Sequence, residues 1–209
     1  MDNLEKGLLA ILDSSKGERS VHSFLKKYPE IVRTAFSMAW NANIEVPEFC
    51  FGNDWRADFL LLSADSGHWI ATFIELEPPN SRLYLNNGTP SKTLRVAQRQ
   101  INDWKEWIRL HESYLREQFS KILTKAGIGA QTGGVHEKAG TEILDPRTVI
   151  SFDFHIVIGR RHSLSAEEQF RRAREGVYWG GAEIATYDRL LSKARMIDDY
   201  QQLLMNRNC

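Results

Sequence analysis

The sequence predicts an α/β protein with a mixed β-sheet flanked by helices. Segments with apolar residues at three- and four-residue steps, typical of amphipathic helices, alternate with short segments rich in β-branched and aromatic residues, typical of strands. Three strand-like segments precede a long helical segment, and another follows it. The first three strands are therefore expected to form a meander, and the helical crossing is expected to bring the later strand beside them.

The predicted elements are three helices, three strands, a long helix, a strand, a helix, a strand and a terminal helix. Leu4, Leu8, Leu9 and Leu12 give the first helix its apolar face. Pro47 indicates an edge position or a bulge for the first strand, because proline cannot donate to a ladder. The predicted bounds are helices at 2–13, 20–28 and 29–40, strands at 43–51, 55–63 and 68–77, the long helix at 91–125, a central strand at 149–159, a helix at 165–175, a strand at 183–187 and a helix from 188 onward.

The length of 209 residues is enough for one sizeable core, so we expect a single domain at 1–209. It would comprise an N-terminal helical part at 1–40, a core at 41–195 and a flexible loop at 126–141 that is rich in glycine. Lys and Arg together number 27, as do Asp and Glu, so any basic site must be local. Two distant cysteines and the lack of a long apolar run predict a cytoplasmic protein without a membrane span. Cys50, within an apolar strand, is expected to be buried.

Two glutamates lie two positions apart in the third predicted strand, and an aspartate lies in the strand before it. Strand side chains alternate between faces, so Glu75 and Glu77 are expected on the same side. Apolar residues occupy both odd and even positions beside Asp58 and Glu75, which predicts strands covered on both faces. A covered carboxylate is costly unless it is compensated, and a divalent cation is one compensator. The alternative is that these acids are solvated at the sheet surface.

Such acids suit the hydrolysis of a phosphodiester, which needs an activated water and neutralised phosphate charge. A cation held by carboxylates serves both needs, and hard ions such as magnesium take oxygen ligands and keep several waters. Asp58 and Glu75 are the candidate ligands, and Glu77 could hold a second ion or position the attacking water as a base. Gln100, on the flank of the long helix's core stripe, could orient a ligand or a phosphate, although an ordinary boundary role is the alternative.

Asp58, then Glu75-Leu76-Glu77, then Gln100 and Trp104 on the next helix resemble the PD-(D/E)XK nuclease superfamily. That superfamily places Asp…(Asp/Glu)-x-Lys on adjacent strands, and some branches add Gln-x-x-x-Tyr on the following helix. Within it, the chain resembles the C-terminal nuclease domain of Shedu anti-phage defence proteins. The resembling pieces run in order over roughly residues 20–195 and lie at 24–29, 47–49, 57–59, 75–78, 97–104, 158–160 and 186–191.

The resemblance implies a restriction-endonuclease-like core (α-β-β-β-α-β) with additional N- and C-terminal helices. It also implies a Mg²⁺- or Mn²⁺-dependent DNA endonuclease that acts in anti-phage defence and forms a possible homo-oligomer. Asp58 and Glu75 would be metal ligands, and Gln100 the supporting helix residue. Glu77 stands where the superfamily usually has lysine, although some of its restriction enzymes use Glu-x-Glu, so Glu77 is expected to complete the metal site. Lys92 is a candidate for a migrated lysine. The second hypothesis is a non-catalytic nucleic-acid-binding or regulatory module.

Local basic groups are the candidates for contacts with DNA. Phosphate contacts from lysine and arginine position a duplex without reading its sequence. The alternative is that such stripes are simply solvated. The predicted DNA-binding residues are Lys92, Arg95 and Arg99 on the long helix and Arg160 and Arg161 after the fourth strand, with Arg171, Arg172 and Arg174 as a further basic group on the next helix.

Overall fold

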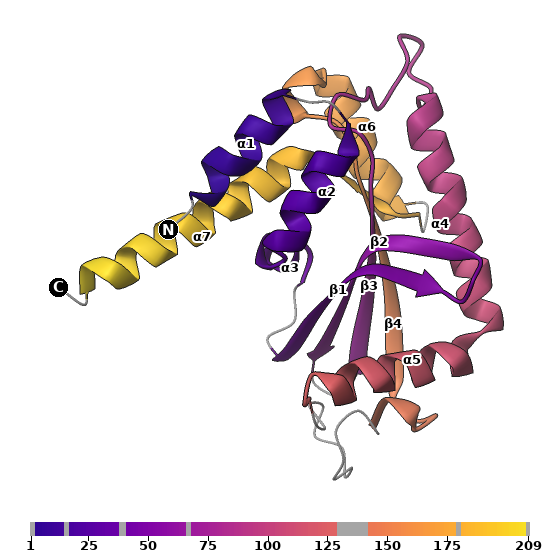
Figure 1. The fold of residues 1–209 in the computed structure, drawn as a ribbon. Coiled ribbons are helices and arrows are strands. Elements are labelled where there is room, and N and C mark those ends of the chain that lie inside the picture. Colours follow the sequence, from indigo (N-terminus) through magenta and orange to yellow (C-terminus); the bar gives the residue numbers. More distant parts are fainter. Residues whose placement is uncertain are drawn as a thin grey trace. The chain divides into compact units, whose positions relative to one another are not determined.

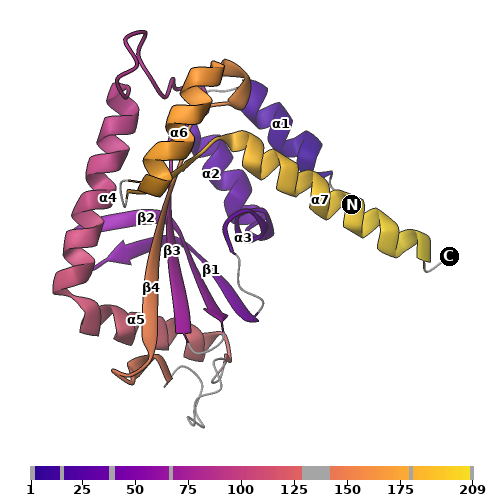
Figure 2. The same ribbon diagram turned by 180° about the vertical axis from the view of Figure 1, so that it is seen from behind.

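The structure is a computed structural model, and it describes residues 3–14, 17–37, 41–65, 68–128, 142–178 and 181–207. The described residues form a mixed five-stranded sheet and seven α-helices, so the predicted α/β class is confirmed (Figures 1 and 2). The helices are α1 (Leu4–Ser14), α2 (Glu18–Lys27), α3 (Glu30–Phe36), α4 (Lys92–Leu110), α5 (Glu112–Lys125), α6 (Ala166–Tyr178) and α7 (Tyr187–Arg207). The strands are β1 (Asn41–Phe51), β2 (Trp55–Asp65), β3 (His68–Leu76), β4 (Val149–Val157) and β5 (Glu183–Ala185).

The strand order is β1-β2-β3-β4-β5. β1 pairs antiparallel with β2, and β2 pairs antiparallel with β3, so the predicted meander is confirmed. β4 lies between β3 and β5, which confirms that the later strand is an interior one beside the meander. β1 is an edge strand of this sheet, in agreement with the position that Pro47 indicates.

The chain divides into two compact units, each built from separate stretches. Unit 1 consists of Met1–Ala35, Leu76–Ala97 and Ile156–Cys209, and unit 2 of Phe36–Glu75 and Gln98–His155. The single domain that we expect from the sequence stays a prediction. Most of the predicted flexible loop at 126–141 lies outside the described residues, which resume at Glu142.

The core of unit 2 explains why β2 and β3 are strands. Six consecutive residues of β2, from Phe59 to Ala64, are buried, so both faces of this strand are covered, as its apolar sequence predicts. Aromatic rings from separate elements meet in this core. The Trp104 ring of α4 lies 5.2 Å from that of Phe51 and 6.3 Å from that of Phe73. Cys50, in contrast, is exposed, so its predicted burial is wrong; this residue lies on the edge strand.

The region predicted as one long helix at 91–125 forms two helices, so this prediction is wrong in that respect. α4 ends at Leu110 and α5 begins at Glu112. Between them, His111 has φ −129° and ψ 29°, which is not a helical conformation. The His111 Nδ1 lies 2.8 Å from the carbonyl oxygen of Trp107, so a side chain takes the place of a backbone partner at the end of α4. The other predicted elements differ from the observed ones by a few residues at their ends.

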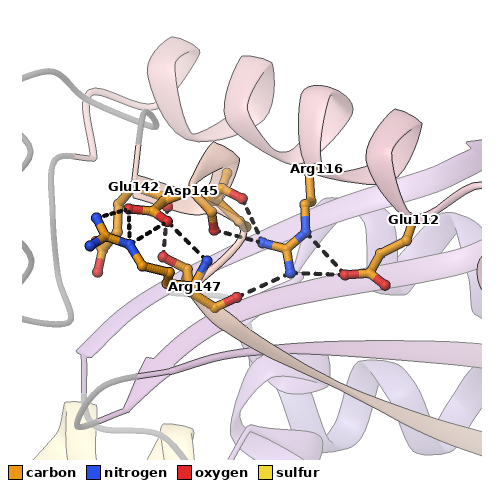
Figure 3. Close-up of polar contacts among 7 residues, drawn as sticks. Glu112, Arg116, Glu142, Asp145 and Arg147 are labelled. Carbon is orange, nitrogen blue, oxygen red and sulfur yellow. Dashed lines mark hydrogen bonds and ion pairs between the residues drawn. The ribbon is translucent and has the colours of Figure 1, made fainter.

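Arg116 of α5 holds η1 (Glu142–Leu144) and the segment that follows it against this helix in unit 2 (Figure 3). Its guanidinium donates to the carbonyl oxygens of Ile143, Asp145 and Thr148 at 3.0 to 3.2 Å. It also pairs with Glu112 one turn earlier, at 2.8 Å. A cavity of about 350 Å³ lies beside this arginine, and the predicted site residues do not line it.

In unit 1, α1 lies alongside α7 (Figures 1 and 2). Leu4, Leu8 and Leu12 are buried, as their spacing predicts, whereas Leu9 is exposed and lies off this buried face. The buried carboxylate of Asp198 on α7 accepts hydrogen bonds from the backbone N–H groups of Leu4 and Glu5, at 3.0 and 2.9 Å. These donors have no partner inside α1, so α7 caps the start of that helix. Within the described residues, no helix has the length and apolar character that crossing a bilayer requires.

Candidate functional site

Asp58 and Glu75 lie at matching positions on β2 and β3. The antiparallel register pairs Phe59 with Ile74 and Leu60 with Phe73. One further step in this register places Asp58 opposite Glu75. Residues opposite each other on antiparallel strands point to the same face, with Cβ atoms about 4.5–5.5 Å apart. Both acids are half-buried, and each lies next to buried apolar residues of its own strand. The two strands therefore bring together two of the residues predicted from the sequence.

Gln100 of α4 reaches the same place from outside the sheet. Its side-chain Nε2 donates a hydrogen bond to the Glu75 carboxylate at 2.8 Å. Trp104 follows one turn later on α4 and contacts the Phe73 ring, two residues before Glu75 on β3. The buried tryptophan thus fixes how this part of α4 lies along β3, and the glutamine points at the acid as a consequence. The amide fixes the orientation of the Glu75 carboxylate.

Glu77 lies just beyond the strand, because β3 ends at Leu76. The strand predicted at 68–77 is therefore one residue too long, and strand alternation does not set the direction of the Glu77 side chain. The backbone of Glu77 is nevertheless held on both sides. Its N–H donates to the carbonyl oxygen of Val157 at 2.8 Å, and its carbonyl accepts from the Tyr187 hydroxyl at 2.7 Å. These two bonds fix where the chain leaves β3.

Tyr187 is a residue of the site region that the sequence argument did not single out. It is the first residue of α7, is fully buried and bonds the carbonyl of Glu77. Tyr187 and Glu77 are 110 positions apart in the chain, so the local sequence around the tyrosine could not predict this contact. Its appearance in one of the pieces that resemble the Shedu domain was the available hint.

We expect Tyr187→Phe to loosen this support. Losing one hydrogen bond to a backbone carbonyl should lower the free energy of unfolding by about 1 kcal/mol, as measured by urea denaturation. If Glu77 takes part in catalysis, DNA cleavage should also fall by about tenfold, which corresponds to ~1.4 kcal/mol. Tyr200→Phe is the matched control, because Tyr200 lies on the same helix and is 63% exposed. Equal cleavage by Tyr187→Phe and wild type would contradict a role for the anchored Glu77.

The predicted DNA-binding residues fall into two groups. Lys92, Arg95 and Arg99 are exposed on α4 and remain available for contact with a ligand. Arg160 is engaged in the protein's own ion pairs, with Asp13 at 3.2 Å and Asp188 at 3.4 Å, and its side chain is only 13% exposed. The neighbouring Arg161 is exposed. The structure therefore separates the two adjacent arginines, which the sequence treats alike.

The donor set near Glu75 decides which metal could be held. Over the ranges that the structure describes, three or more His, Cys, Asp or Glu side chains are nowhere gathered in a group that could hold a metal ion. Asp58 and Glu75 offer two carboxylates. Magnesium is commonly bound through one or two carboxylates, with waters and substrate phosphates as its other ligands, so this pair fits such an ion. A closed zinc site needs four protein ligands and does not fit. The place of Glu77 in a metal site stays a prediction.

These features define an α/β protein with a pair of carboxylates on facing positions of two strands and an amide from the following helix bonded to one of them. The family model described as Shedu protein SduA, C-terminal, matches residues 15–191 of the chain. The chain therefore belongs to the Shedu protein SduA C-terminal family, as its sequence resemblance implies. A search of curated proteins gave no match.

Proposed function

We propose that the chain is a metal-dependent endonuclease that hydrolyses DNA phosphodiester bonds. The observation that carries this proposal is the contact of Gln100 with Glu75, on the strand position that faces Asp58. A solvated surface acid has no need of an amide that fixes its orientation. A carboxylate that must present its oxygens to a cation in one geometry does, because partners of metal ligands orient those ligands.

Each residue has a stated role in this proposal. Asp58 and Glu75 would hold Mg²⁺ or Mn²⁺ between the two strands, and Gln100 keeps the Glu75 carboxylate turned toward the ion. A bound cation of this kind supplies charge neutralisation at the phosphate and lowers the pKa of a bound water. Glu77 would then take the proton of the attacking water or add a carboxylate oxygen to the site. Lys92, Arg95 and Arg99 would contact the DNA backbone.

The biological role follows from the family rather than from the geometry. Membership of the Shedu family supports a part in anti-phage defence. The assignment to the PD-(D/E)XK superfamily belongs to the same proposal, and the supporting features are the acids on neighbouring strands and the glutamine on the following helix. Action in the cytoplasm and assembly into a homo-oligomer are also part of this proposal.

Cleavage of supercoiled plasmid DNA in Mg²⁺ or Mn²⁺ tests the proposal, with EDTA as the metal-free condition. We expect wild type to nick or linearise the plasmid and Asp58→Asn to lose this activity. Asp153→Asn is the matched control, because Asp153 is also an acid on a strand of unit 2 but is exposed on β4. Equal cleavage by wild type and Asp58→Asn would contradict the proposal.

A second candidate is a non-catalytic module that binds nucleic acid and keeps the nuclease fold. The observation that favours it is Glu77 at the position where the superfamily usually has lysine, since a glutamate cannot supply positive charge to the phosphate. In that case wild type would bind DNA without cleaving it, and Asp58→Asn would bind equally well. Substituting Glu77→Lys separates the two, because a gain of cleavage from an inactive wild type would identify a site that has lost its lysine.

A further inference from the structure

Arg172 of α6 is a half-buried arginine that uses little of its hydrogen-bonding capacity. Its Nη1 donates to the carbonyl oxygen of Ile184 on β5 at 2.6 Å. Its Nε–H is buried and has no hydrogen-bond partner in the described part of the chain. A guanidinium carries five N–H donors, and leaving a buried donor without an acceptor costs about 1–3 kcal/mol. An acceptor from outside the chain would remove this cost.

Two further arginines raise the positive potential around Arg172. Burial lowers the pKa of the Arg172 guanidinium, and the charges of Arg189 and Arg161 lower it further, while Glu183 and Tyr84 act in the opposite direction. We call Arg161, Arg172 and Arg189 the arginine cluster. It draws on the segment after β4, on α6 and on α7, and all three residues belong to unit 1. Arg161 is exposed, so the cluster is open to solvent on that side.

The carboxylates near the cluster balance its charges only in part. Glu183 pairs with Arg189. Asp188 accepts from the backbone N–H of Arg161 at 2.5 Å and also pairs with Arg160. Glu175, on the same helix as Arg172, accepts a hydrogen bond from the Tyr84 hydroxyl at 3.0 Å. Each of these acids has a partner other than the Arg172 side chain. An additional anion would therefore relieve both the repulsion among the arginines and the unused donors of Arg172.

We propose that the arginine cluster is an anion site that seats a phosphate group of a nucleic-acid backbone. Guanidinium groups match phosphate geometry because two parallel N–H donors meet two oxygens, and arginine is the preferred residue where a partly buried phosphate is held. The choice of DNA as the ligand rests on the proposed function. The proposal also refines the sequence prediction, because it places Arg161 in a DNA contact together with Arg172. Arg189 adds positive charge nearby while it pairs with Glu183, and Arg160 keeps its structural ion pairs.

Binding of a short fluorescent DNA duplex, measured by anisotropy in EDTA, tests the proposal without any cleavage. We expect Arg172→Gln and Arg161→Gln each to weaken binding by about tenfold. Each lost phosphate contact should also reduce the slope of log affinity against log salt concentration by about 0.9. Arg147→Gln is the matched control, because Arg147 is 85% exposed and pairs only with Asp145 among the described residues. Unchanged binding by Arg161→Gln and Arg172→Gln would overturn the proposal.

Two additional measurements show whether a loss of DNA binding comes from misfolding or from the loss of a site for free phosphate. Circular dichroism of each variant verifies the fold, and Arg161→Gln keeps the test valid if Arg172→Gln misfolds, because Arg161 is an exposed side chain. Thermal unfolding in inorganic phosphate, compared with chloride at equal ionic strength, detects a site for a free anion. A stabilisation by phosphate that Arg172→Gln removes, together with unchanged DNA binding, would identify a free-phosphate site and overturn the nucleic-acid assignment.

The outcome is also distinguishable from failure of the nuclease proposal. The binding assay contains no metal ion, so it does not depend on Asp58 or Glu75. If Asp58→Asn leaves plasmid cleavage unchanged while Arg172→Gln weakens DNA binding, the proposed catalytic site is wrong and the anion site stands. If Asp58→Asn abolishes cleavage while Arg172→Gln binds DNA like wild type, the anion site is wrong and the proposed catalytic site stands.

Discussion

Glu75→Gln is expected to abolish DNA cleavage with little effect on folding. Glutamine has the shape of glutamate, and its Oε1 can still accept the hydrogen bond that Gln100 donates at 2.8 Å. The substitution therefore removes the negative charge and leaves the local packing in place. Loss of a charged metal ligand should lower the cleavage rate by roughly 10³-fold, which corresponds to about 4 kcal/mol of transition-state stabilisation. Initial rates of plasmid cleavage over a range of Mn²⁺ concentrations measure the effect.

Gln100→Ala provides the graded comparison for this prediction. Removing a residue that only orients a ligand costs about 10–100-fold in metal affinity or activity. The loss in Gln100→Ala should thus be smaller than in Glu75→Gln, and high Mn²⁺ concentration should restore part of it. A greater loss in Gln100→Ala than in Glu75→Gln would contradict the roles assigned to the two residues, and wild-type activity of Glu75→Gln would contradict the site itself.

Trp104→Ala is expected to have the greatest effect on stability. Trp104 is fully buried and contacts the rings of Phe51 and Phe73. Replacing a buried tryptophan with alanine removes apolar contacts and leaves a cavity, which together cost about 3–5 kcal/mol of unfolding free energy. The indole Nε1–H is buried without a partner in the described residues, so no hydrogen bond is lost with the ring. Urea denaturation followed by far-ultraviolet circular dichroism measures the change.

Trp55→Ala is the control for Trp104→Ala. Trp55 is at the start of β2 and is 39% exposed, so its removal should cost much less than that of the buried ring. A loss of less than about 1 kcal/mol in Trp104→Ala would contradict the conclusion that this residue fixes α4 along β3. DNA cleavage by Trp104→Ala should also fall, because Gln100 lies one turn away on the same helix.

Much of the fold could be predicted because it depends on local patterns. The run from Phe59 to Leu62 is apolar at odd and even positions alike, and the structure buries these four residues together with Ser63 and Ala64. The spacing of Leu4, Leu8 and Leu12 marked the buried face of α1. The order of these patterns was sufficient for the meander and for the interior position of β4. Because the two strands were predicted to be neighbours, Asp58 and Glu75 could be proposed as a pair without knowledge of the strand register.

The features that were missed depend on single backbone states or on distant partners. The apolar stripe continues across His111, so periodicity alone could not reveal that α4 and α5 are separate helices. The pairing of Arg160 with Asp13 joins residues 147 positions apart, and nothing in the local sequence distinguishes Arg160 from Arg161. The same holds for Tyr187, whose contact with Glu77 depends on how α7 is placed beside the end of β3.

Manganese binding measured by isothermal titration calorimetry tests the central claim most directly, namely that Asp58 and Glu75 hold a divalent cation. We predict saturable binding of Mn²⁺ to wild type, retained binding in the Asp153→Asn control, and loss of this binding in both Asp58→Asn and Glu75→Gln. The measurement requires neither DNA nor catalysis, so it examines the site alone. Wild-type Mn²⁺ affinity in Asp58→Asn and Glu75→Gln would contradict the claim.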